Sequence, residues 1–173
     1  MDVPREIQTE MECPVCGSNL YLITYDTEIP YEGKISIYTY FCKECRYKKT
    51  EVYSDEKRDP KKITIKVESP EDLRIIVYRS RKADVYIPEM EASIDSAEYS
   101  NGEITTIEGI VYRIGEKLDL LAVDDQGNEK IEMLRKRIDG IINGKFESFT
   151  LIIMDESGKS VVHSEKAMVE SMD

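Results

Sequence analysis

The chain has 173 residues, of which 40% are hydrophobic and 34% are charged, and its net charge is −11. This composition is typical of a globular protein, and the negative charge argues against a broad nucleic-acid surface, because phosphate binding requires clustered cations. No apolar run approaches the roughly 18 residues that a membrane span needs, and the acidic N-terminus is unlike a signal sequence. We therefore expect a cytoplasmic protein.

The first 54 residues contain all four cysteines and the pattern of a β-hairpin. Apolar residues at 20–23 and at 35–40 mark the two strands of this hairpin. A charged segment at residues 54–60, which ends in proline, is typical of a linker or turn. We therefore predict that residues 1–54 form one domain and residues 55–173 a second.

One basic cluster interrupts the acidic chain between residues 43 and 66, where nine basic residues accompany five acidic ones. Lysine on an exposed strand edge discourages aggregation between sheets, so a solvated strand edge is one explanation. A role in binding a partner is the other.

The second domain combines strands with one pair of helices. Alternating or continuous apolar residues predict strands at 63–67, 73–78, 85–87, 149–154 and 160–162. Thr105 and Glu108 fit a capping box that begins a helix, with Thr105 as the N-cap. A second helical stripe ends at Asn143, where glycine follows. The sequence therefore predicts a mainly β (α+β) fold with a helical hairpin at about residues 104–143.

Two Cys-x-x-Cys motifs, Cys13 with Cys16 and Cys42 with Cys45, are the most specific chemical signal in the sequence. Two such motifs can bind one tetrahedral ion through four thiolates at about 2.3 Å, and the intervening hairpin brings them together as in a zinc ribbon. A reducing cytosol disfavours two disulfides. A thioredoxin-like role fits poorly, because neither motif opens a helix after a strand. We predict one structural zinc ion without an open coordination position.

Residues for catalysis are hard to find elsewhere in the sequence. The one histidine, His163, lies near the C-terminus, and a lone histidine is more often a packing or surface residue than a catalyst. Gly102, Gly109 and Gly115 have the wrong spacing for a phosphate-binding loop. We expect that the chain is not an enzyme.

The chain resembles the ZPR zinc-finger protein family (member one), in a single-module form like that of archaea. The resembling blocks lie at residues 13–16, 41–47, 71–74, 77–80, 87–89, 102–109 and 149–158. The resemblance implies a four-cysteine zinc ribbon followed by a double-stranded β-helix, or jelly-roll-like domain, with an inserted helical hairpin.

The resemblance also implies a function. Eukaryotic relatives, which carry two such modules, bind translation elongation factor one-alpha, the GTPase that carries aminoacyl-tRNA, and assist its folding. We therefore expect a zinc-binding protein that serves as a folding or assembly chaperone of this factor. The alternative is a nucleic-acid-binding zinc ribbon, whose candidate contacts are Lys43, Arg46, Lys48 and Lys49.

Several residues outside the metal site are candidates for binding the partner. They lie around the second cysteine motif or at strand ends, where loops often carry binding residues: Tyr40, Arg46, Tyr47, Lys48, Arg79, Ser80, Pro88 and Glu89. Arg46 stands where the family usually has glycine. Because glycine suits a turn with positive φ, we expect Arg46 to strain the second motif or to alter its turn.

Overall fold

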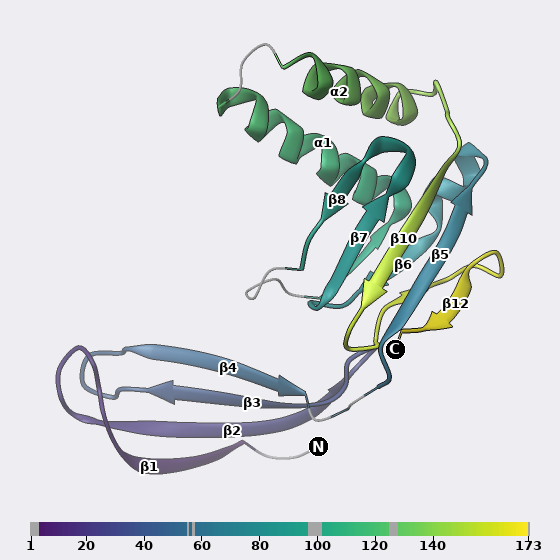
Figure 1. Ribbon diagram of the computed structural model, residues 1–173. Helices are drawn as coiled ribbons and strands as arrows, with labels where there is room; N and C mark the ends of the chain where they lie inside the picture. Colours follow the sequence, from purple (N-terminus) through teal and green to yellow (C-terminus); the bar gives the residue numbers. More distant parts are fainter. Residues whose placement is uncertain (1–3, 55, 57, 97–101, 125–127, 173) are drawn as a thin grey trace. The chain divides into compact units, whose positions relative to one another are not determined.

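The computed structural model describes residues 4–54, 56, 58–96, 102–124 and 128–172 (Figure 1). Backbone contacts divide the chain into two compact units, Met1–Lys57 and Arg58–Asp173. The first unit contains the cysteines and is called the ribbon below, and the second is called the β-domain. Their buried apolar residues form two separate clusters, so each unit has a core of its own.

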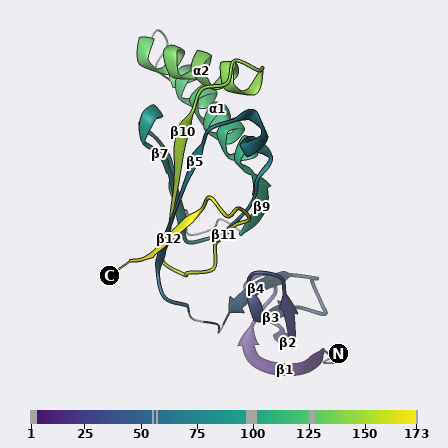
Figure 2. The same cartoon turned by 90° about the vertical axis from the view of Figure 1, so that its right-hand side faces the viewer.

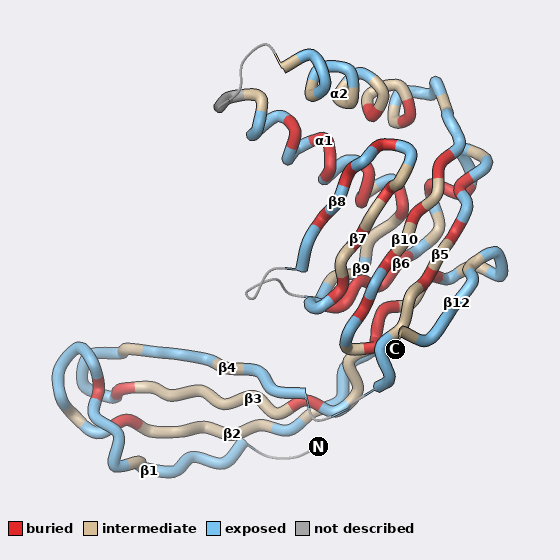
Figure 3. The backbone as a smooth tube through the Cα atoms, in the orientation of Figure 1, coloured by how far each residue is buried: buried red, intermediate tan, exposed pale blue. Residues whose placement is uncertain are grey.

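The ribbon is a single antiparallel sheet with the strands in sequence order. Its strands are β1 (Arg5–Glu12), β2 (Asn19–Ile29), β3 (Gly33–Phe41) and β4 (Lys48–Ser54). The predicted hairpin is confirmed as β2 and β3, in which Tyr25 lies opposite Ile37. Most ribbon residues are half-buried or exposed, as Figure 3 shows, because no second layer within the ribbon covers its sheet.

The β-domain is a sandwich of two antiparallel sheets, the jelly roll that we expected (Figure 2). One sheet has the strand order β12-β5-β10-β7-β8, and the other has the order β11-β6-β9. The strands are β5 (Lys61–Val67), β6 (Ile76–Arg79), β7 (Ala83–Ile87), β8 (Ala92–Ile94), β9 (Glu103–Thr106), β10 (Phe149–Asp155), β11 (Val161–Val162) and β12 (Met168–Ser171). Two short 3-10 helices, η1 (Pro70–Arg74) and η2 (Pro88–Met90), connect strands.

Strand alternation fills the core of the sandwich. β10 lies between β5 and β7, and every second side chain of β10 is buried. Leu151 of β10 lies opposite Ile65 of β5, and both side chains are at most 1% exposed. The buried side chains of β10 face the core, and β10 has a hydrogen-bonded neighbour on each side, so the strongly hydrophobic segment that begins at Phe149 becomes the central strand.

The predicted helical hairpin is confirmed between β9 and β10 as α1 (Ile107–Asp124) and α2 (Glu129–Ile142). The two helices lie at one end of the sandwich in both views (Figures 1 and 2). The apolar stripe of α1 joins the core through Ile107, Ile110, Val111, Ile114 and Leu118. No described helix is both long enough and apolar enough to traverse a bilayer.

Two details of the prediction were wrong. The helix cap is Thr106 rather than Thr105, because β9 continues through Thr106 and the Thr106 hydroxyl accepts the Gly109 N–H at 3.1 Å. The predicted strand at 73–78 is shorter, because Pro70 favours a helical turn and Leu73 lies in η1. The strand itself begins at Ile76.

Candidate metal centre

A tight turn at residues 13–18, called the first knuckle, positions Cys13 and Cys16. The Cys13 N–H donates to the Ser18 carbonyl at 2.8 Å, and the Gly17 N–H donates to the Cys13 carbonyl at 2.9 Å. These two bonds fold the loop back on itself, so that both cysteine side chains project from one compact turn.

The second knuckle, residues 42–47, repeats this turn. The Cys42 N–H donates to the Tyr47 carbonyl at 2.9 Å, and the Arg46 N–H donates to the Cys42 carbonyl at 3.0 Å. Arg46 has a φ of 62°, in the left-handed region that favours glycine. Arg46 therefore does not alter the turn, which has the same hydrogen bonds as the first knuckle. Instead, Arg46 adopts a backbone conformation that is unfavourable for a residue with a Cβ.

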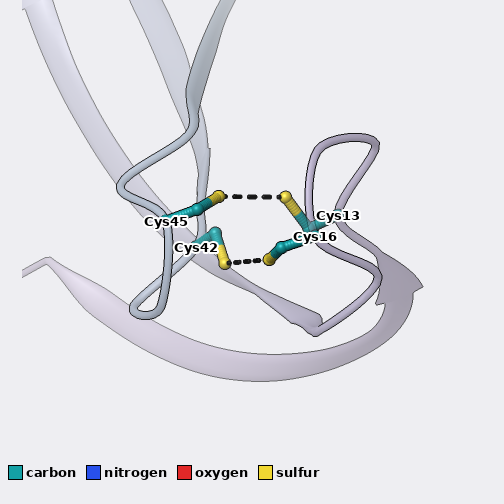
Figure 4. Close-up of side chains that lie close together, drawn as sticks. All are labelled: Cys13, Cys16, Cys42 and Cys45. Atoms are coloured by element: carbon teal, nitrogen blue, oxygen red, sulfur yellow. Dashed lines mark hydrogen bonds between the residues drawn. The ribbon is translucent and has the colours of Figure 1, made fainter.

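The two knuckles bring the four sulfur atoms together (Figure 4). The Sγ atoms of Cys13 and Cys45 are 3.5 Å apart, as are those of Cys16 and Cys42. All four lie within 4.8 Å of one another. A tetrahedral zinc ion with bonds of about 2.3 Å requires sulfur atoms about 3.8 Å apart. The site therefore fits zinc, and four protein thiolates fill its coordination sphere.

Little apolar material surrounds this site. Cys13 and Cys42 are buried, whereas Cys16 and Cys45 are exposed. The buried cluster of the ribbon consists of the two buried cysteines and Leu20, with Tyr40 and Tyr47 packed against it. Because such a small cluster stabilises a fold weakly, a zinc ion bound by the four thiolates would supply much of the cohesion of the ribbon.

The thiols differ in acidity. The backbone N–H and the hydroxyl of Ser18 lower the pKa of Cys16 to about 6. The Tyr47 N–H also lowers the pKa of Cys45, but desolvation and hydrogen bonds to the other three thiols outweigh it and raise that pKa to about 12. Binding of a metal dication therefore releases protons from the site. The sequence analysis missed Ser18, whose only signal is its position two residues after Cys16.

The predicted partner-binding residues of the ribbon fall into two groups. Tyr40 and Tyr47 are half-buried against the cysteine cluster, so part of each ring serves the core. Arg46 and Lys48 are exposed.

The predicted residues at the end of β6 are not surface residues. Arg79 is 5% exposed, and its guanidinium donates to the Glu103 carboxylate at 3.0 Å and to the Ala83 carbonyl at 3.1 Å. Ser80 is 1% exposed, and its hydroxyl donates to Asp155 at 2.7 Å. Contrary to our expectation, neither side chain offers a surface to a partner.

Pro88 and Glu89 lie at the start of η2. Pro88 is half-buried, and Glu89 is exposed. The Glu89 carboxylate accepts the N–H of Thr150 at 3.0 Å and its hydroxyl at 2.8 Å. Glu89 therefore ties η2 to β10, in addition to being accessible.

A further buried carboxylate, which the sequence did not reveal, is that of Asp155, which is 0% exposed. Its carboxylate accepts the Ser80 hydroxyl at 2.7 Å, the Ser157 N–H at 2.8 Å and the Ser160 N–H at 2.6 Å. Burial alone would raise its pKa, but these hydrogen bonds lower it to about 2. Asp155 is therefore a charged anchor that joins the ends of β6 and β10.

Two family models match the chain. The ZPR1 zinc-finger domain matches residues 6–58, and the ZPR1 jelly-roll domain matches residues 71–172. The first match includes all four cysteines of the sulfur cluster. Together with the geometry of the four sulfur atoms, this match confirms the predicted zinc cofactor.

Relatives in archaea and eukaryotes match most of the chain. An uncharacterized ZPR1-like protein of Methanocaldococcus jannaschii is 35% identical over 90% of this chain and 80% of its own length. A similar protein of Pyrococcus horikoshii is 34% identical over 90% and 73%, respectively. The zinc finger chaperone zpr1 of Schizosaccharomyces pombe is 32% identical over 88% of this chain, but over only 34% of its own length. This chain belongs to the ZPR1 zinc-finger family.

Proposed function

We propose that this chain is a zinc-dependent chaperone that binds translation elongation factor one-alpha in the cytoplasm and assists its folding or assembly. The observation that carries the proposal is that both family domains occur in one chain, whose relative in fission yeast is named a zinc finger chaperone. The chain matches about a third of that relative, so a single module would perform the binding.

The metal site supports a binding role rather than catalysis. Four thiolates from Cys13, Cys16, Cys42 and Cys45 leave no coordination position for a substrate or an activated water, which is typical of structural zinc. The zinc then acts by holding the ribbon in shape. A chaperone without enzymatic activity is consistent with this arrangement.

The test is a pull-down of the elongation factor from the same organism by the tagged full-length chain. We expect retention in the nucleotide-free or the GDP-bound state, and loss of retention with the Cys42→Ser variant. The Lys34→Gln variant, which changes an exposed residue of β3, serves as the control. Failure of the wild-type chain to retain the factor in both states contradicts the proposal.

A nucleic-acid-binding ribbon is supported less well. Of its four candidate cations, Lys43 pairs with Glu6 at 2.6 Å and Lys49 pairs with Glu51 at 2.8 Å. Lys43 also lies 3.8 Å from the centre of the Tyr21 ring, which occupies that face of the aromatic group. With two cations already paired, we expect at most weak binding of RNA or DNA with a shallow dependence on salt.

A further inference from the structure

The outer edge of β4 is open. β4 pairs with β3 on one side and ends the strand order of the ribbon on the other. The register with β3 is unbroken from Phe41 opposite Lys48 to Ile35 opposite Ser54. Six of the seven residues of β4 are exposed. An open edge of this length presents backbone N–H and C=O groups at the spacing that another strand requires.

The other open edges of the described sheets are less suited to this role. β1 is interrupted by a register shift between Gln8 and Glu12 and carries several glutamates, and irregularity and charge both protect an edge. In the β-domain, the edge strands β8, β12, β9 and β11 have four residues or fewer. Among the described strands, β4 is therefore the longest regular open edge.

The side chains of β4 change in character along its length. Because successive residues point to opposite faces, Lys48 and Val52 share one face, and Lys49 and Tyr53 share the other. Each face thus carries a cation near the second knuckle and an apolar side chain four residues further on. Val52 and Tyr53 are each 50% exposed. Lys48, Lys49 and Glu51 protect the knuckle end of this edge against aggregation, whereas Val52 and Tyr53 leave its far end apolar.

The knuckle end of this edge carries positive charge that the ribbon leaves unmatched. Arg46 and Lys48 are exposed, and neither forms an ion pair with another residue in the described ranges. The neighbouring Lys49 is paired with Glu51 of the same strand at 2.8 Å. Arg46 and Lys48 are therefore the cations at this end of the edge that are available to an acidic partner.

We infer that the β4 edge binds an extended peptide segment of a client protein as a fifth strand of the ribbon. The segment has acidic residues beside Arg46 and Lys48 and apolar residues beside Val52 and Tyr53. Nucleic acid does not match the row of backbone groups on a strand edge, whereas a peptide does. A second copy paired symmetrically about Glu51 would place two glutamates opposite each other, which is unfavourable. The inference rests on the proposed function for the identity of the client, and it adds where the client is bound and by what chemistry.

The experiment measures binding of fluorescein-labelled eight-residue peptides to the full-length, zinc-loaded chain by fluorescence anisotropy. The probe has glutamates in one half and valines in the other, and is made in both orders. Three controls are the same peptide with lysine in place of glutamate, the same peptide with alternate backbone nitrogens methylated, and an eight-nucleotide single-stranded RNA. The double variant Arg46→Gly with Lys48→Gln removes both charges, and glycine suits the backbone at position 46. Its matched control is Arg5→Gln with Lys34→Gln, which removes two exposed charges of the ribbon elsewhere.

We expect saturable binding of the acidic probe in one of the two orders. The double variant should weaken it about fivefold or more, and the matched control should leave it unchanged. Backbone methylation should weaken it by on the order of 100-fold, because each blocked N–H loses a hydrogen bond.

Each of three results would overturn the inference. The first is equal binding of the methylated or the lysine peptide, and the second is tighter binding of the RNA. The third is sedimentation of the chain as a dimer that pairs through β4. The pull-down of the elongation factor separates this outcome from failure of the proposed function. If the wild-type chain retains the factor but binds no acidic peptide, only the inference of a β4 site is wrong. If the chain binds the peptide but not the factor, the β4 site stands and the elongation factor is not its client.

Discussion

Gly17 and Arg46 hold equivalent places in the two knuckles. The N–H of each donates to the carbonyl of the first cysteine in its motif, at 2.9 Å for Gly17 and 3.0 Å for Arg46. Both have a positive φ, 74° for Gly17 and 62° for Arg46. The turn therefore imposes the same backbone conformation in both places, whether or not the sequence supplies glycine.

This equivalence predicts opposite effects of two substitutions. Arg46→Gly should stabilise the ribbon by up to about 1 kcal/mol, since relief of the left-handed strain outweighs the added freedom of the unfolded chain. Gly17→Ala should destabilise it by about 1 kcal/mol through backbone strain alone, because no atom lies within 4 Å of the added Cβ. The measurement is the chelator concentration at which half of the ribbon unfolds. Shifts of both variants in the same direction would contradict the prediction.

Loss of one ligand should unfold the ribbon and spare the β-domain. Cys42 is 1% exposed and belongs to the small cluster of the ribbon, whereas the core of the β-domain is a separate cluster. We expect the Cys42→Ser variant to lose stoichiometric zinc and the amide protection of β2 and β3, with β10 still protected. Metal analysis and hydrogen exchange measure the two effects. Full zinc content with a protected ribbon in this variant would show that four thiolates are not required.

Asp155 should make the β-domain sensitive to acid. Its hydrogen bonds hold the pKa in the folded state at about 2, below the ordinary value of 3.8, so folding favours the charged form. The resulting stabilisation, about 2 kcal/mol, is complete above pH about 4 and is lost as the pH falls through about 2. Asp155→Asn should remove this dependence and destabilise the fold by about 2 to 3 kcal/mol at neutral pH.

Urea unfolding of both proteins between pH 2 and pH 7 measures this effect. The exposed Asp95 provides the matched control, and Asp95→Asn should keep the wild-type profile. An unchanged acid dependence in the Asp155 variant would assign that dependence to other carboxylates.

Two glycines near the end of α2 should respond oppositely to alanine. A Cβ at Gly140 would lie 3.6 Å from the nearest atom, an ordinary contact, so Gly140→Ala should stabilise the helix by up to about 1 kcal/mol. Gly144 has a φ of 89°, so Gly144→Ala should destabilise by about 1 kcal/mol even though its surroundings are open. Thermal unfolding of the full chain measures both, and stabilisation by Gly144→Ala would contradict the backbone argument.

The sequence predicted the metal site best because its determinants are local. The spacing within each Cys-x-x-Cys motif decides the turn, and the hairpin between Cys16 and Cys42 decides that the motifs meet. The central strand that begins at Phe149 was also predictable, because its apolar residues are continuous.

The errors of the prediction arise from contacts between distant segments. Ser80 looks like an exposed residue at a strand end, but its hydroxyl donates a hydrogen bond to the carboxylate of Asp155, which is 75 residues away. Thr105 and Thr106 are equally good caps by residue type, and the pairing of Thr106 with Ile76 extends β9 and decides between them. The exposed edge strand Met168–Ser171 has no apolar periodicity from which to predict it.

The position of β10 at the centre of its sheet determines when each unit can fold during synthesis. Leu151 pairs with Ile65, and Ile153 pairs with Val85, so the five-stranded sheet lacks its central strand until the ribosome has released the segment up to Asp155. All four strands of the ribbon lie within the first 54 residues of the chain, and their sheet includes no strand of the β-domain. On a translating ribosome, we therefore expect the ribbon to fold and bind zinc before the central strand of the β-domain has been synthesised.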